Sequence, residues 1–250
     1  MTSHLQQVNA ALVVGASGGI GLEMVHQLLE QPTIHQIYAT YNRSNDALQA
    51  ISDSRLTQLP LDLTNEAQIA TVVQTIQATT PALHLVVNCA GVLHTDAMQP
   101  EKSLRHLNPQ QLSDYFLVNS IGPALLAKHL PPLLKQGDRA VFATLSAKLG
   151  SIGDNQLGGW YGYRASKAAL NQLMRTTAIE YKRTCPNAIV VTLHPGTTDT
   201  QLSRPFQRNV PPDKLFTPQR TVRQLLLVID QLQNSDSGEF FSWDGNRLPW

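Results

Sequence analysis

The sequence predicts an α/β protein with a Rossmann-type, doubly wound parallel sheet and helices on both faces, folded as a single domain over residues 1–250. Strand-like runs alternate with helical patterns along the whole chain, which implies right-handed crossovers between parallel strands. A glycine-rich segment separates the first apolar run from the first helical pattern. A chain of 250 residues that is 42% hydrophobic can bury one core of this size.

The expected elements follow one another in a regular order. Strand-like stretches lie at residues 10–14, 36–41, 56–61, 83–88, 139–145, 189–194 and 239–242. Helical patterns run from residue 22 to about residue 32 and near 46–52, 66–78, 109–135, 161–182 and 219–233. Ligands of such sheets bind at the carboxyl ends of the strands, so the residues that follow each strand are the candidates for a site.

The first strand leads into a glycine-rich turn, Gly15-Ala16-Ser17-Gly18-Gly19-Ile20-Gly21. Strand, turn and helix together predict the opening of a nucleotide-binding βαβ unit, because glycines permit a sharp turn and a helix N-terminus attracts a pyrophosphate. We therefore expect cofactor contacts at Gly15, Ser17, Gly18, Gly19, Ile20 and Gly21. The glycines fit two spacings, GxxxGxG from Gly15, Gly19 and Gly21, or GxxGxxG from Gly15, Gly18 and Gly21.

The residues after the second strand bear on the choice of dinucleotide. NAD sites usually place a carboxylate here for the ribose hydroxyls, whereas NADP sites place a cation for the 2′-phosphate. The segment offers Arg43, with Asn42 and Ser44 beside it, and no carboxylate before Asp46. Arginine binds phosphate through two donors at once. The alternative is a solvated loop arginine. We expect NADP(H) in preference to NAD(H), contacted by Asn42 and Arg43.

Tyr163 and Lys167 are four residues apart in a run that is otherwise helical, so they share one helix face. A nearby ammonium favours the phenolate and lowers the pKa of the tyrosine. Such a tyrosine can give a proton to a carbonyl oxygen or take one from an alcohol. This spacing also occurs by chance on solvated helices. The nucleotide-binding segment earlier in the chain favours the catalytic interpretation.

The composition predicts a cytoplasmic enzyme that acts on small molecules. The net charge of +1 gives no electrostatic reason to expect nucleic acid or an acidic membrane as partner. Cys89 and Cys185 are too few for a disulfide framework or a metal site. Residues 1–4 lack the features of a secretion signal, and no apolar run reaches membrane length.

The glycine turn and the chain length together resemble the classical short-chain dehydrogenase/reductase family. The segments DNxxGGWYxYRASKAALN and HPGTxDTxLSxPF, with the strand end before them, resemble a narrower group of C-factor-like and Sniffer-like carbonyl reductases. The resemblance extends from Val13 to Trp250. It implies the fold predicted above and an oxidoreductase that uses NAD(P) to interconvert a carbonyl and an alcohol.

The resemblance also implies cofactor contacts after the later strands. Asp62 and Leu63 would lie at the adenine, although a carboxylate before a helix also suits an N-cap, which Thr64 or Asn65 could supply instead. The run Asn88-Cys89-Ala90-Gly91 matches the family pattern at Asn88, Ala90 and Gly91, and Cys89 is expected to be a small buried filler. Pro195, Gly196, Thr198 and Thr200 would bracket the nicotinamide.

The catalytic set implied by the resemblance is Tyr163, Lys167, Asn119 and Ser146. In the family the asparagine distorts its helix and holds a water of a proton relay, while the lysine binds the nicotinamide ribose. The serine departs from the pattern: alignment on Gly150 puts Ala147 in the catalytic position, and residues 151–160 form an inserted loop. We expect Ser146 to fill the role. If Ala147 holds it, Tyr163 binds the substrate oxygen alone or with a loop hydroxyl such as Ser151.

The remaining expectations concern the lid, the assembly and the alternatives. The segment 197–218 has little regular pattern and follows the cofactor residues, so we interpret it as a substrate-covering lid. The family commonly pairs its long fourth and fifth helices, which implies a homodimer or homotetramer. Two other functions stay open: a C-factor-like signalling or nucleotide-sensing protein without turnover, and a lyase or epimerase. The sequence does not name a substrate.

Overall fold

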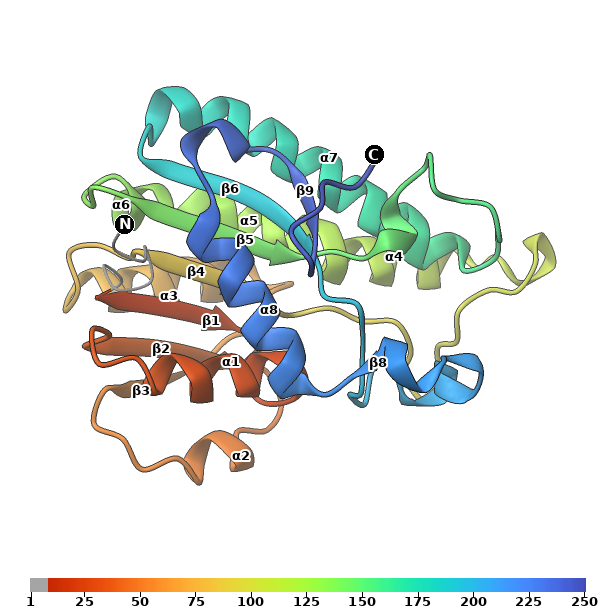
Figure 1. The fold of residues 1–250 in the computed structure, drawn as a ribbon, viewed down its shortest axis with the longest axis horizontal. Coiled ribbons are helices and arrows are strands. Elements are labelled where there is room, and N and C mark those ends of the chain that lie inside the picture. The colour runs from red at the N-terminus through yellow and green to blue at the C-terminus, as the bar shows by residue number, and fades with distance from the viewer. Residues whose placement is uncertain (1–8) are drawn as a thin grey trace.

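The computed structural model describes residues 9–250. Residues 1–4, used above against a secretion signal, lie outside the described part of the chain. The centre is a seven-stranded, wholly parallel sheet with the order β3-β2-β1-β4-β5-β6-β9 (Figure 1). The predicted fold class is therefore confirmed.

The strands lie close to their expected positions. Their bounds are β1 Ala10–Val14, β2 Gln36–Tyr41, β3 Leu56–Pro60, β4 Leu85–Asn88, β5 Ala140–Leu145, β6 Ala188–His194 and β9 Phe240–Ser242. β1, β4 and β5 are buried at every position, because helices cover both faces of the sheet. A second, two-stranded parallel sheet pairs β7, Thr197–Thr198, with β8, Leu215–Phe216, so the segment 197–218 is more ordered than the sequence suggests.

Helices pack on the two faces of the sheet in separate groups (Figure 1). They are α1 Gly19–Leu29, α2 Asp46–Gln49, α3 Glu66–Gln77, α4 Pro109–Phe116, α5 Gly122–His129, α6 Pro131–Leu134, α7 Tyr161–Thr184 and α8 Pro218–Gln231. Apolar residues of α1 and α8 form one buried core with the sheet. Apolar residues of α3, α5 and α7 form the core on the opposite face.

The single helix expected over residues 109–135 is divided. A π-helical turn, Leu117–Ile121, separates α4 from α5, and the short α6 follows after Leu130. The widened turn contains Asn119, whose amide is held by backbone outside the helix. The consecutive Pro131 and Pro132 cannot donate to the preceding helical turn, which accounts for the second break. Among residues 9–250, none of the helices is both long and apolar enough to cross a membrane.

Candidate active site

The glycine turn after β1 is packed so closely that two of its glycines cannot be replaced without movement. Gly15 has a φ of 75°, and a Cβ there would stand 2.8 Å from the Ala90 nitrogen. A Cβ on Gly21 would stand 2.1 Å from the Gly15 carbonyl oxygen. Thr40, at the end of β2, fixes the turn: its Oγ1 accepts from the Gly15 N–H at 3.2 Å, and its carbonyl accepts from Ala16. The sequence analysis did not single out this threonine.

The N-terminus of α1 is open and suits an anion. Gly18 provides no side-chain cap for the first turn, and a Cβ built on Gly18 meets nothing within 4 Å. Ser17, Gly18 and Gly19 are exposed. N–H groups of an uncapped first turn, together with the helix dipole, favour a phosphate. A Cβ on Gly19 would lie 3.2 Å from Thr200 Cγ2, so the segment after β6 reaches this turn.

The next strand ends supply the groups expected at the adenosine half of a dinucleotide. Asn42 and Arg43 are exposed after β2. Asn65 caps α3 by accepting from the Gln68 N–H at 3.2 Å, which decides between the capping alternatives, while Asp62 Oδ1 accepts from Thr64. The side chain of Leu63 is buried in the core, so only its backbone is available to a ligand.

The turn after β4 lies close to the π-helical turn and to α7. Asn88 is fully buried and its Oδ1 accepts from the Ala90 N–H at 3.2 Å. A Cβ on Gly91 would lie 3.4 Å from Asn119 Oδ1 and 3.5 Å from Lys167 Nζ. Glycine at this position therefore leaves open the space between these two groups. Cys89 is partly buried, and burial raises the pKa of its thiol to about 12, which fits the expected filler role.

Asn119 connects three segments from inside the π-helical turn. Its Oδ1 accepts from the Val92 N–H at 2.8 Å, and its Nδ2 donates to the Val92 carbonyl at 2.9 Å. The same Nδ2 donates to Ser166 Oγ at 3.1 Å, and that hydroxyl donates to the Tyr163 carbonyl at 2.9 Å. Asn119 and Ser166 are both fully buried. The expected helix distortion at Asn119 is thus present, and Ser166 is a linking residue that the sequence analysis missed.

Tyr163 and Lys167 lie on one face of α7, as their spacing predicts. Lys167 Nζ is 5.9 Å from the centre of the Tyr163 ring and donates to the Leu145 carbonyl at 2.9 Å. Burial lowers the pKa of Lys167 to about 8, because the interior disfavours the ammonium. Burial also raises the pKa of Tyr163, which is opposite to the direction expected from the lysine alone. At this separation, desolvation of the phenolate outweighs the attraction of the lysine.

The structure places Ser146 away from Tyr163. Its Oγ donates to Asn171 Oδ1 at 2.7 Å, on the next turn of α7. Ala147 instead belongs to the buried cluster that contains Tyr163, and Ser151 Oγ accepts from the Asp154 N–H. The expectation that Ser146 reaches the substrate oxygen therefore disagrees with the geometry. Side chains alternate after β5, so only one of residues 146 and 147 can face Tyr163, and that residue is the alanine.

The segment after β6 turns sharply at Gly196 and packs on β8. Gly196 has a φ of 76°, and a Cβ there would lie 2.6 Å from Phe216 Cε2, so β8 packs directly on the Pro195-Gly196 turn. Thr198 Oγ1 shares a hydrogen bond with Thr221 of α8 at 2.8 Å, and the Thr198 carbonyl accepts from Ser203 Oγ, so of its polar backbone groups only the N–H remains for a ligand. Thr200 follows, with its N–H donating to Ser203 Oγ.

An apolar wall surrounds Tyr163. Leu93, Met98 and Ala147 are buried with it, and Trp160 and Phe206 pack on the same cluster. The Trp160 ring meets Tyr163 edge-on at 6.3 Å and Phe206 at 4.8 Å between ring centres. Phe206 comes from the segment interpreted as a lid. The sequence placed Phe206 within the lid segment and Trp160 at the end of the inserted loop, without a role for either; the Gly158-Gly159 pair before Trp160 was the available signal.

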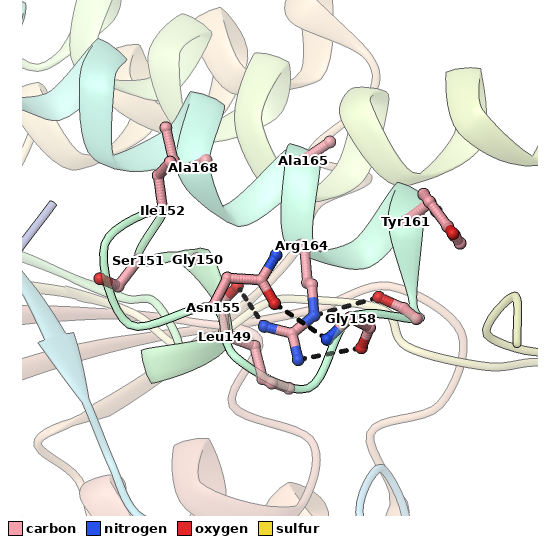
Figure 2. Close-up of a pocket in the computed structure, with 11 residues that line it drawn as sticks. Leu149, Gly150, Ser151, Ile152, Asn155, Gly158, Tyr161, Arg164, Ala165 and Ala168 are labelled. Atoms are coloured by element: carbon pink, nitrogen blue, oxygen red, sulfur yellow. Dashed lines mark hydrogen bonds between the residues drawn. The ribbon is translucent and has the colours of Figure 1, made fainter. Parts of the chain in front are cut away.

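A pocket of about 430 Å³ lies on another face of α7, beside the loop after β5 (Figure 2). Tyr161, Ala165 and Ala168 line it from the helix. Arg164 crosses it and donates to the carbonyls of Gly158 and Gly159. Tyr161 therefore belongs to this pocket and not to the cluster around Tyr163.

Comparisons with known proteins agree with this geometry. The sequence profile described as short chain dehydrogenase matches residues 9–211. The C-signal protein of Myxococcus xanthus is 36% identical over 136 residues, which are 54% of this chain and 76% of that protein.

Two solved structures are similar over almost the whole chain. The NADPH-bound carbonyl reductase from chicken fatty liver has a TM-score of 0.87 and 27% identity, covering 97% of this chain and 94% of that one. Carbonyl reductase Sniffer of Drosophila melanogaster has a TM-score of 0.85 and 26% identity, covering 97% and 100%. The chain therefore belongs to the short-chain dehydrogenase/reductase family of oxidoreductases, in the group that resembles Sniffer and C-factor.

Proposed function

We propose that this chain is an NADP(H)-dependent oxidoreductase that interconverts a carbonyl and an alcohol, with Tyr163 as the acid/base. The observation that carries the proposal is the connected set of Tyr163, Lys167 and Asn119. Ser166 joins Asn119 to the backbone of Tyr163, and Gly91 leaves open the space between Asn119 and Lys167. This set lies at the strand ends beside the glycine turn, where such a sheet binds its ligands.

The residues present fit a dinucleotide phosphate. The uncapped start of α1 would hold the pyrophosphate, and Arg43 with Asn42 would hold the 2′-phosphate. Backbone of Asp62-Leu63 and of Asn88, Ala90 and Gly91 would line the adenosine half. Pro195-Gly196 and the Thr198 backbone would face the nicotinamide, with Thr200 near the phosphates. When bound, NADPH supplies the hydride. A similar structure, the chicken carbonyl reductase, is described as NADPH-bound.

In reduction, Tyr163 Oη holds the proton that the carbonyl oxygen takes up. Burial keeps this phenol protonated until a substrate arrives, because it raises the pKa of Tyr163. Lys167 is protonated below about pH 8 and favours the phenolate that proton transfer leaves behind. Asn119 and the Val92 backbone fix the turn that faces Lys167 and thus hold the relay in place. With Ala147 beside it, Tyr163 binds the substrate oxygen without a partner serine.

The test is the variant Tyr163→Phe, with Tyr161→Phe as the matched control on another face of α7. NADPH oxidation is followed with a panel of aldehydes, ketones and diketones, and NADPH binding by fluorescence titration. Removing the acid/base should lower kcat by at least about 100-fold. The Kd for NADPH should change by less than twofold, and the control should keep wild-type turnover. Wild-type turnover in Tyr163→Phe would overturn the proposal.

One observation favours a second candidate, a nucleotide-sensing protein with little or no turnover. Ala147 stands where a serine hydroxyl would assist Tyr163. The similarity to the C-signal protein points the same way. Tight NADPH binding without oxidation of NADPH by any carbonyl in the panel would favour this candidate over the first.

The proposal also covers the lid, the oligomeric state and the location of the enzyme. We infer that residues 197–218 cover the substrate, because Phe206 already contacts Trp160 over the site. A homodimer or homotetramer would bury the apolar side chains that α7 and the π-helical turn expose, among them Ile179 at 61% and Ile121 at 42% exposure. Light scattering on the purified chain measures this assembly, and fractionation tests a cytoplasmic location.

A further inference from the structure

Trp160 has an unusual backbone conformation. Within residues 9–250 it is the one non-glycine residue with a positive φ, at 52°. It follows Gly158 and Gly159, whose φ values are 64° and 66°. The left-handed region is rarely adopted by a bulky side chain and persists only where surrounding contacts enforce it. The contacts on this tryptophan are therefore informative.

Glu101 supplies the contacts on one side. Its carbonyl accepts from the Trp160 N–H at 2.5 Å, and its carboxylate Oε2 accepts from the Gly162 N–H at 3.1 Å. Trp160 itself provides no side-chain cap for α7, so the cap comes from a residue distant in sequence. A negative charge at a helix N-terminus is favourable. A Cβ on Gly162 would stand 2.8 Å from Glu101 Oε1, which shows how closely the two segments approach.

Arg164 holds the loop on the other side. Its guanidinium donates to the carbonyls of Leu149, Gly158 and Gly159, as Figure 2 shows around the pocket. The backbone on both sides of the loop is thus tied to the first turn of α7. The backbone of Trp160 lies between the two anchors and cannot move away from the site without breaking one of them.

The side chains of Trp160 and Glu101 both lie at the proposed site. The indole packs between Tyr163 and Phe206. Glu101 is 1% exposed, and its Oε1 has no hydrogen-bond partner among residues 9–250. A buried carboxylate with an unpaired oxygen is costly. The contact with the Trp160 N–H is made by the Glu101 backbone carbonyl, so the carboxylate acts on the position of the indole through the Gly162 N–H, two residues after Trp160.

We infer that Glu101 is a positioning residue that fixes Trp160 over Tyr163, and that Trp160 selects carbonyl compounds with an apolar group large enough to contact the indole. This inference rests on the proposed function, since it concerns the substrate side of the same tyrosine. Ala147, Leu93 and Met98 complete the apolar surroundings. The indole is the largest side chain that the strained loop adds to them.

The first test is a selectivity ratio, kcat/KM for benzaldehyde divided by kcat/KM for propanal, with NADPH saturating. Trp160→Ala should lower the ratio by at least about tenfold, the effect of losing apolar contact in a pocket. Trp160→Phe should restore it to within threefold of wild type. Trp160→Gly is the second variant, since glycine adopts a φ of 52° without strain. Equal losses for both aldehydes would overturn the selective role.

The positioning role of Glu101 is tested by asking whether the effect of its substitution on the selectivity ratio requires Trp160. Glu101→Ala should lower the same ratio about fivefold or more, whereas Glu101→Gln should preserve it because an amide oxygen still accepts from Gly162. In the Trp160→Ala background, Glu101→Ala should have no further effect on the ratio. Glu66→Ala removes a half-exposed glutamate paired with Lys128 and His129, far along the chain from Trp160, and is the matched control. If Glu101→Ala lowers the ratio as much in the Trp160→Ala background as in the wild type, the positioning role is wrong.

A fluorescence measurement tests whether Glu101 positions Trp160, and it does not require turnover. With Trp243→Phe and Trp250→Phe, Trp160 is the remaining indole of the chain. Adding Glu101→Ala should shift its emission to the red as the indole gains water, and adding Glu101→Gln should not. An unchanged emission in Glu101→Ala overturns the inference even if carbonyls are reduced. Absence of NADPH oxidation in the wild type would overturn the proposed function, while a red shift would still support the link.

Discussion

Ser146→Ala is expected to lower stability and leave catalysis intact. In the structure Ser146 Oγ is a buried donor to Asn171 Oδ1 at 2.7 Å, and it does not belong to the cluster around Tyr163. Removing the hydroxyl deletes one hydrogen bond and leaves a buried amide oxygen without its donor. Asn171 Nδ2 already has no partner among residues 9–250, so the variant leaves both polar atoms of this amide unpaired.

The magnitude follows from the burial of both partners. Ser146 is 4% exposed and Asn171 is 2% exposed, so water does not readily replace the lost donor. Leaving one buried acceptor unsatisfied costs about 1–3 kcal/mol. For a chain of this size, a loss of about 2 kcal/mol lowers Tm by roughly 4–8 °C. The hydroxyl touches no reacting atom, so kcat/KM should stay within about twofold of wild type.

The assay combines thermal unfolding with NADPH-coupled reduction of an aldehyde that the wild type reduces. Ser151→Ala is the matched control, because it removes another buried hydroxyl that serves a local turn. Ala147→Ser is the complementary variant and should raise kcat by adding a hydroxyl beside Tyr163. A fall of 100-fold or more in kcat for Ser146→Ala, with an unchanged Tm, would refute the geometry and return Ser146 to the role first expected from the sequence.

Three further predictions concern the cofactor side and the lysine. Arg43→Ala should raise KM for NADPH at least about tenfold and leave KM for NADH unchanged, measured in parallel titrations; equal changes would refute phosphate recognition. Gly21→Ala should abolish NADPH binding or folding, because its Cβ would stand 2.1 Å from the Gly15 oxygen, and near-normal binding by calorimetry would contradict the packing. Burial lowers the pKa of Lys167 to about 8 from 10.5, so the folded state resists protonation. The unfolding free energy should therefore rise with pH between about 8 and 10.5, by on the order of 3 kcal/mol at most, and Lys167→Met should remove this rise in denaturant titrations.

The parallel sheet and its helices are predictable because each element carries its own local signal. β1 is a continuous apolar run, β4 is apolar up to Asn88, and α1 follows a glycine turn. The break at Leu117–Ile121 is different. It comes from the amide of Asn119 pairing with Val92, which is 27 residues away in the chain, and no local pattern contains that contact. The second break, by contrast, has a local signal in Pro131-Pro132.

The candidate site, like the fold, is predictable only where the signal is local in the sequence. Tyr163 and Lys167 share a helix face by spacing alone, so the sequence suffices to place them together. The choice between Ser146 and Ala147 depends on which way the chain points after β5, and the sequence leaves both open. Glu101 is an isolated glutamate after Pro100, and its role exists only where the segment after β4 meets the start of α7. Tertiary contacts of this kind define the substrate side of the site.

The most direct test of the central claim follows a deuterium from cofactor to product. The wild-type chain and Tyr163→Phe are each incubated with an aldehyde and with NADPH that carries deuterium at both C4 positions of the nicotinamide, and the alcohol is analysed by mass spectrometry. We predict that the wild type forms alcohol with one deuterium on the carbinol carbon, and that Tyr163→Phe, which still binds NADPH, forms almost none. Unlabelled alcohol, or equal labelled product from both proteins, would contradict hydride transfer with Tyr163 as the proton donor.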